Sequence, residues 1–325
     1  MKSSNIGGQA VLEGIMMKHG NEYSVAVRKP DGEICVTKNT YRSITGKLEG
    51  LTKIPFVRGM FNFVDSMVLG IKTLTYSASF YDEEEDEKEL TEEESAIKEK
   101  KDKWMMGGAV AFSIVAAVAI FMVLPYLLSN LLKHYISSRG ILTALEGVIR
   151  MGIFLLYIGL ISKMKDIQRT FMYHGAEHKC INCIEHGMPL TVENVRKSSR
   201  QHKRCGTSFL FFVMIVSIIF CFFITAESQV LKVGLRIALM PVIAGVSYEM
   251  IRLAGNSENP VVNLLSRPGM WVQMMTTKEP DDSMIEVAIR AVEEVFDWKA
   301  YLKDNVSAAG NFTEKQGCTQ EGCAL

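Results

Sequence analysis

Two histidines and a glutamate lie close together within FMYHGAEHKCINCIEHG, residues 171–187 of this sequence. His174 and His178 are four residues apart, a spacing that places both imidazoles on one face of a helix, one turn apart. Two imidazoles placed in this way are suited to binding one metal ion, and zinc commonly takes such ligands. Glu177 completes the pattern H-x-x-E-H, in which the glutamate is a general base toward a water that the metal activates. The stretch therefore predicts a divalent-metal site, with zinc as the expected ion and Glu177 as the catalytic residue.

Further candidate ligands lie downstream. His202 and Cys205 stand in QHKRCGTS, and Glu249 lies 71 residues after His178, a spacing that resembles the inverted zincins. These residues fall at the ends of apolar segments that reach the same predicted membrane face, so they can meet there. We expect the two helical histidines and His202 to bind the metal, with Cys205 or Glu249 completing the set.

A structural zinc site competes for two of these residues. Cys180 and Cys183 form a C-x2-C pair, and His202-x2-Cys205 follows after 18 residues, which is the spacing of a closed zinc site. Such a site would belong to a non-enzymatic membrane scaffold or regulator. A third interpretation is that all these side chains only form hydrogen bonds at the membrane surface.

Four apolar segments are long enough to cross a bilayer, which needs about 20 residues. They lie at roughly 105–131, 141–162, 207–225 and 233–253. The second segment carries Glu146 and Arg150, which are spaced so that they can pair on one helix face inside a bundle. The predicted fold class is an α-helical integral membrane protein with about four transmembrane helices.

The distribution of basic residues predicts the orientation of these spans. The loop at 163–206 carries nine Lys or Arg against four acids, whereas the loops at 132–140 and 226–232 carry few. Short basic loops stay in the cytoplasm. We therefore expect a multipass cell-membrane protein with cytoplasmic N- and C-termini and the candidate site in the cytoplasmic loop.

The flanking segments divide further. Residues 1–55 predict a small β-containing unit, because YSVAVRKPDGEICVTK reads as two strands about the turn Pro30-Asp31-Gly32. Within 56–80, Arg58, Asp65 and Lys72 recur every seven residues, which predicts an amphipathic helix at the membrane interface or packed on the bundle. The remaining expectations are a charged linker at 81–104, a transmembrane domain at 105–253, a cytoplasmic segment at 254–302 with a helix over about 284–297 capped near Asp281, and a disordered tail at 303–325.

The composition excludes two classes of function. Lys and Arg total 36 and Asp and Glu total 36, a balance that argues against a nucleic-acid binder. Seven unevenly spaced cysteines do not form a secreted disulfide framework. The lipid bilayer is the one partner that the sequence predicts.

Several separate strings occur in an order that resembles one family. They are GGQAVLEGIMMK, YHGAEHK, LTVENVRKSSRQHKRCGTSF, SYEMIRLAG and RPGMWVQMMTTKEPDDSMIEVAI. Together they resemble the YqhQ family of bacterial multipass membrane proteins, from about Ile6 to Phe296. The resemblance implies a metal-dependent enzyme and marks five positions as family motifs: His174, Glu177, His178, His202 and Cys205.

The sequence thus predicts a metal-dependent enzyme of hydrolytic type at the cytoplasmic membrane face. A peptide bond near the membrane and a lipid-linked group both remain open as its substrate.

Overall fold

The computed structural model describes residues 3–43, 54–81, 92–224, 228–257 and 259–305. The predicted tail from residue 306 and the most acidic part of the predicted linker, 82–91, lie outside the described residues. The chain is an α-helical membrane protein with a small N-terminal sheet, as its sequence predicts.

Four antiparallel strands form the sheet: β1 (Ile6–Val11), β2 (Gly14–His19), β3 (Glu22–Arg28) and β4 (Ile34–Thr40). They pair in chain order, so β1 and β4 are the edge strands. The expected strand pair is present as β3 and β4, and Gly32 in their turn has a φ of 88°, which glycine adopts without strain. β1 and β2 were not expected, because Gly7 and Gly8 weaken the strand signal of the first hairpin.

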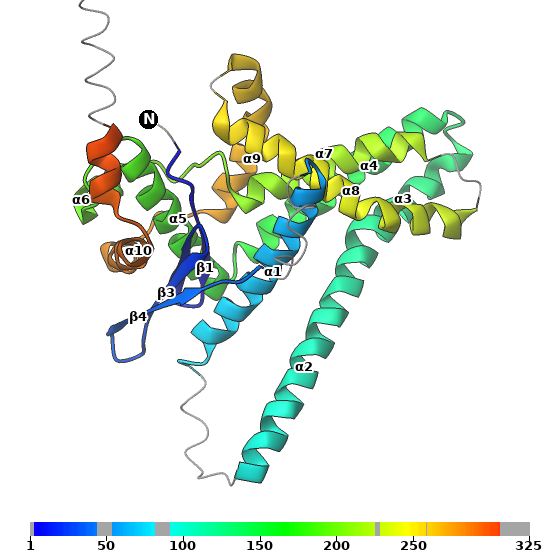
Figure 1. Ribbon diagram of the computed structural model, residues 1–325. Coiled ribbons are helices and arrows are strands. Elements are labelled where there is room, and N and C mark those ends of the chain that lie inside the picture. The colour runs from blue at the N-terminus through cyan, green and yellow to red at the C-terminus, as the bar shows by residue number, and fades with distance from the viewer. Residues whose placement is uncertain (1–2, 44–53, 82–91, 225–227, 258, 306–325) are drawn as a thin grey trace, which may run out of the picture.

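All four predicted spans are helices of membrane length: Trp104–His134, Arg139–Ile161, Gly206–Phe223 and Val230–Asn256. The first is made of α2 (Glu92–Val118), a π-helical turn (Ala119–Val123), α3 (Leu124–Leu131) and a final 3-10 turn (Leu132–His134). The others are α4 (Arg139–Ile161), α7 (Gly206–Phe223) and α8 (Gln229–Asn256). α2 stands apart from the other helices and joins them through its C-terminal end (Figure 1). Since α2 begins at Glu92, the second half of the predicted linker is helical.

The predicted amphipathic helix is α1 (Val57–Ala78). It packs on α8, where the backbone at Gly59 comes so close to Tyr248 that a Cβ would lie 2.7 Å from the Tyr248 side chain. Another face of the helix leaves Met67, Ile71 and Leu74 exposed. α1 therefore packs on the bundle and still presents an apolar face of the kind that lies in a membrane interface.

Two helices around the candidate site differ from expectation. α4 ends at Ile161 and α5 (Lys165–Glu185) begins anew after Met164, whose backbone is extended, so the candidate histidines lie on a helix separate from the second span. A further helix, α9 (Pro260–Thr276), follows the last span and packs on α7. It was not predicted, because Pro268 interrupts its pattern.

The helix near the C-terminus confirms its predicted start and buried face. α10 (Asp282–Val295) begins after Asp281, whose side chain accepts a hydrogen bond from the Met284 N–H. Its apolar residues pack against α5 and the sheet, where they share one core with Ile15, Met17 and Ile181. The sheet, α5, α10 and the short α6 (Val192–Lys197) thus form one body beside the apolar helices (Figure 1).

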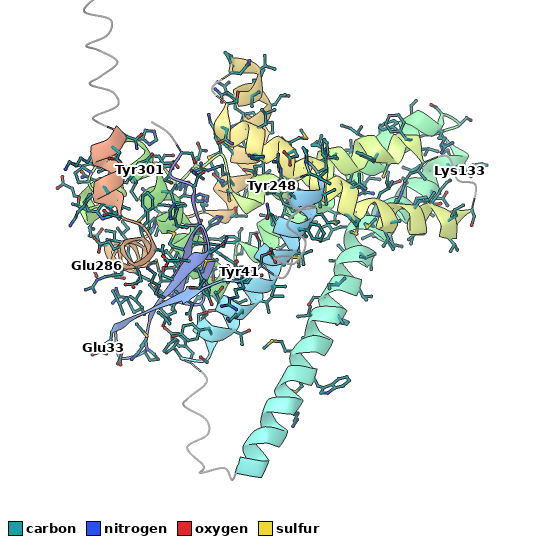
Figure 2. The ribbon with its side chains drawn as sticks, viewed as in Figure 1. Glu33, Tyr41, Lys133, Tyr248, Glu286 and Tyr301 are labelled. Atoms are coloured by element: carbon teal, nitrogen blue, oxygen red, sulfur yellow. The ribbon has the colours of Figure 1, made fainter. Side chains whose placement is uncertain are left out.

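The bundle and this body lie at opposite ends of the molecule. Lys133, in the 3-10 turn that ends the first span, lies far from Glu33 and Glu286, which belong to the body (Figure 2).

The body core supplies a stability test. Ile285→Ala removes a fully buried side chain from the contact between α10 and α5, so we expect a loss of roughly 2–5 kcal/mol in the free energy of unfolding. Glu294→Ala on the exposed face of the same helix is the matched control, with an expected change within about 0.5 kcal/mol. Thermal melting in detergent measures both, and equal melting temperatures for the two variants would contradict this packing.

Candidate metal centre

The site is centred on two imidazoles from α5. His174 and His178 project from one face of the helix with ring centroids 4.4 Å apart. One ligand atom from each of them and the Sγ of Cys205 all lie within 4.8 Å of one another. Among the described residues, these three side chains form the one group with metal-ligand spacing.

Cys205 reaches the histidines from the start of α7. It is the N-cap residue of that helix, and its Sγ accepts a hydrogen bond from the Thr207 N–H at 3.4 Å. The same Sγ lies 3.2 Å from Nε2 of His174. A thiol at a helix N-terminus beside imidazoles is in the environment that favours its thiolate, which is the form that binds metal.

Two backbone carbonyls orient the imidazoles. Nδ1–H of His174 donates to the carbonyl of Thr276 at 2.9 Å, and Nδ1–H of His178 donates to the carbonyl of Arg200 at 2.7 Å. Because a carbonyl only accepts, Nδ1 carries the proton in both rings and Nε2 is left to face Cys205 or a cation. This pattern, in which the second ring nitrogen is fixed by a hydrogen bond, is typical of metal-binding histidines.

A glycine in α5 allows the first of these contacts. A Cβ on Gly175 would lie 2.0 Å from the carbonyl oxygen of Lys278. The segment after α9 can therefore lie directly on α5, where the Lys278 N–H also donates to the Phe171 carbonyl at 2.9 Å. This close approach brings the neighbouring Thr276 carbonyl to His174.

The electrostatics couple the thiol to the imidazoles. Burial alone would raise the pKa of Cys205, but the charge of His174 and hydrogen bonds from both imidazoles hold that pKa well below its usual value. Burial alone would lower the pKa of His174, yet the Cys205 thiolate raises it to about 9. These opposite pKa shifts favour a thiolate beside an imidazolium, and a cation that took the place of the Nε2 proton would meet a deprotonated sulfur.

Glu177 lies beside these ligands, under the edge strand β1. Its carboxylate accepts a hydrogen bond from the backbone N–H of Gly8. Burial raises the pKa of Glu177, against the opposing charges of His178 and His174. Gly8 touches the carboxylate so closely that a Cβ there would lie 2.9 Å from Cδ of Glu177 and 2.8 Å from the Met16 carbonyl oxygen.

The structure does not bring the other two predicted ligands into this group. The His202 ring is 5.7 Å from that of His178, and its Nε2 lies 3.6 Å from Oε2 of Glu185. Burial lowers the pKa of His202, which keeps the imidazole neutral. Glu249 forms an ion pair with Arg58 of α1, with Nε to Oε1 at 2.6 Å, because α1 packs on α8 at that position.

The four residues of the alternative zinc site do not form one group either. Cys180 and Cys183 are both buried in the core between α5 and α10. The Cys183 thiol donates to the carbonyl of Pro189 at 3.4 Å, on the side of α5 that faces α6. Burial raises the pKa of both thiols, so these cysteines behave as apolar core residues.

Sequence reasoning missed the groups that hold the ligands in place. Gln273 of α9 binds the backbone of His202 twice, accepting from its N–H at 2.8 Å and donating to its carbonyl at 2.9 Å. This clamp fixes the loop that carries Arg200 and Cys205. A sequence does not show which backbone carbonyls will accept a hydrogen bond from a histidine. The adjacent glycines at 7 and 8, by contrast, indicate that the backbone there lies close to another group.

The contact between Gly8 and Glu177 predicts different effects for two neighbouring glycines. Gly8→Ala forces a Cβ against the Met16 backbone and Glu177, so we expect it to destabilise the protein by roughly 1–3 kcal/mol and to displace Glu177. Gly7→Ala is the matched control, because nothing lies within 4 Å of its added Cβ. Thermal melting of both variants tests this, and a Gly8→Ala protein as stable as Gly7→Ala would contradict the contact.

Comparison with known proteins agrees with the motif resemblance. A family model described as "Protein of unknown function (DUF1385)" matches residues 54–298, which include all three clustered side chains. The chain is 35% identical over 307 residues to "Uncharacterized protein YqhQ" of Bacillus subtilis (strain 168), covering 94% of this chain and 96% of that protein. No solved structure matches it. The family model covers more than half of the chain, and the relative covers nearly all of it. The chain therefore belongs to the DUF1385 family, together with YqhQ.

Proposed function

We propose that this protein is a membrane-embedded metal-dependent hydrolase whose active site lies at the cytoplasmic membrane face. The observation that carries the proposal is the group formed by His174, His178 and Cys205, with ligand atoms within 4.8 Å of one another. Three protein ligands are typical of catalytic zinc sites, which keep one position open, whereas structural sites use four.

The donor set favours zinc among the common divalent ions. Two imidazole nitrogens and one thiolate are borderline and soft ligands, whereas magnesium and calcium prefer oxygen. The Nδ1–H contacts of both imidazoles leave Nε2 free to bind, and the low pKa of Cys205 supplies a thiolate. When bound, zinc supplies a Lewis acid that makes water nucleophilic near neutral pH.

Glu177 is the proposed general base. It precedes His178 in the same buried helix turn and interacts electrostatically with both imidazoles and Cys205. It is not one of the three clustered ligands, and the Gly8 N–H holds its carboxylate in place. Such a carboxylate accepts a proton from the attacking water and later donates it to the leaving group.

A cavity next to β1 favours an anionic substrate. It has a volume of about 450 Å³, and Gly8, which contacts Glu177, is part of its wall. Its charged lining residues are Lys18, Arg204 and Arg252, all basic. Since Arg252 lies near the end of a span, this wall favours the lipid-linked group over the peptide bond as substrate.

A cysteine nucleophile is the second candidate. The Cys205 sulfur lies 3.2 Å from Nε2 of His174, which is the geometry of a thiol activated by a base. In that case Cys205 would attack the substrate and no metal would be needed. The scaffold with a structural zinc site is less well supported, because its four proposed ligands do not converge.

Metal content separates these candidates. We expect about one zinc ion per chain in protein purified without chelator, as in a three-ligand site, and none in His174→Ala/His178→Ala. Cys180→Ser/Cys183→Ser is the matched control and should keep its zinc, because those thiols lie in the core. Elemental analysis measures the zinc content of all three proteins. Loss of zinc from the cysteine variant alone would support the structural site instead.

The role of Glu177 predicts a split between binding and turnover. Glu177→Gln keeps the size and a hydrogen-bond acceptor for Gly8 but removes the base. We expect an unchanged zinc content and a fall in turnover of roughly 10²–10⁴-fold, measured on a panel of peptides and phosphorylated lipids. Zinc lost from this variant would make Glu177 a ligand, and full activity would remove it from the mechanism.

A further inference from the structure

A second cluster of charged groups lies inside the transmembrane bundle, away from the metal centre. Glu146 and Arg150 pair on α4, with Nη2 of Arg150 donating to Oε1 at 2.8 Å. Arg236 of α8 joins them, and its Nη2 donates to Oε2 of Glu146 at 2.8 Å. We call these three residues the membrane arginine site. The pairing of Glu146 with Arg150 was predicted from the sequence, whereas the contribution of Arg236 was not.

The membrane arginine site carries two positive charges and one negative charge. All three residues are buried, with 4% of Glu146, 5% of Arg150 and 7% of Arg236 exposed. Arg150 lies near the middle of its 23-residue span. An unbalanced charge at such a depth is costly, so the site favours an anion that supplies the second negative charge.

Both arginines keep unpaired donors. Nε of Arg150 and Nε of Arg236 are buried and have no hydrogen-bond partner among the described residues. The other guanidinium nitrogens have neighbours: Nη1 of Arg150 donates to Ser217 at 2.9 Å, and Nη1 of Arg236 lies 2.7 Å from Oε1 of Glu146. The Arg236 guanidinium also lies 5.0 Å from the Tyr126 ring centre. Buried N–H groups without partners usually indicate a missing ion, water or ligand.

An apolar cavity of about 260 Å³ adjoins these arginines. Its wall contains Arg150, Arg236 and Ser217 but not Glu146, so the cavity faces the positive side of the site. Most of the remaining wall is aromatic or aliphatic, including Phe209 and Phe220. A ligand that fits this wall has an apolar body and one anionic group.

The helices that form the wall are irregular at this position. The π-helical turn Ala119–Val123 contributes Phe121 and Met122. α8 contains Pro241, next to the wall residue Met240. π-helical turns inside helices are frequent at functional sites, and a proline removes one helical hydrogen bond. Both irregularities thus occur in segments that line the cavity.

We propose that the membrane arginine site binds an anionic amphiphile, a single apolar chain with one carboxylate or phosphate. The anionic group would lie at the two guanidiniums, and the chain would occupy the apolar cavity. This site is independent of the metal centre, since none of its residues belongs to the cluster on α5.

Displacement of a fluorescent fatty acid from the detergent-purified full chain tests the proposal. Unlabelled oleate and a single-chain lysophosphatidate should compete, whereas oleyl alcohol, which has the same chain without the charge, should bind at least about 10-fold more weakly. The two acids distinguish a carboxylate ligand from a phosphate ligand. If the alcohol competes as well as both acids, the cavity holds any chain and the proposal is wrong.

Charge variants give a second test with a matched control. Arg150→Gln leaves one acid facing one base, so we expect at least about 10-fold weaker oleate binding. Glu146→Gln keeps both arginines and should bind oleate at least as tightly as the parent. If Arg150→Gln does not fold, Arg236→Gln replaces it in this test, with the same expected loss of oleate binding. His174→Ala/His178→Ala should bind oleate normally, so failure of the metal centre and failure of this site are distinguishable. Unchanged binding in a folded arginine variant would overturn the proposal.

Discussion

Two backbone carbonyls determine what the histidines on α5 can do. The carbonyls of Thr276 and Arg200 hold the Nδ1 proton of each ring, and this directs both Nε2 atoms toward Cys205. The arrangement requires the loop before α7 and the segment after α9 both to pack against the face of α5 that carries the two histidines. Gln273 fixes the loop through His202, and Gly175 allows the segment to approach α5. The site thus depends on tertiary packing that unites parts of the chain about 100 residues apart.

The same dependence explains why the small sheet belongs to the site. β1 is an edge strand, and edge strands have N–H groups that no neighbouring strand uses. The Gly8 N–H donates to Glu177, a buried carboxylate that would cost free energy if it had no hydrogen-bond partner. Gly8 therefore stabilises a residue 169 positions away in the sequence. In the bundle, by contrast, the charge of the membrane arginine site is only partly balanced by protein groups.

Much of the fold could be predicted from the sequence, because long apolar runs and regular helix periodicity are local signals. The four spans, the β3–β4 turn, the cap at Asp281 and the buried face of α10 all follow from such signals. The break at Met164 could not be predicted, because no proline marks it, and α9 could not be predicted, because Pro268 interrupts its pattern. In the site, the four-residue spacing identified His174 and His178, and proximity to a span identified Cys205. His202 and Glu249 were chosen by the same proximity, but each has another partner: Glu185 for His202 and Arg58 for Glu249.

We propose that zinc binds two imidazoles and the single thiolate of Cys205. X-ray absorption spectroscopy of the zinc-loaded protein counts these ligands directly. We expect one sulfur at about 2.3 Å and two nitrogens at about 2.0–2.1 Å from the zinc, with a further light-atom ligand. Three sulfurs would show that Cys180 and Cys183 bind the ion with Cys205, and a shell without sulfur would show that Cys205 is not a ligand. Either result would contradict the proposed metal centre.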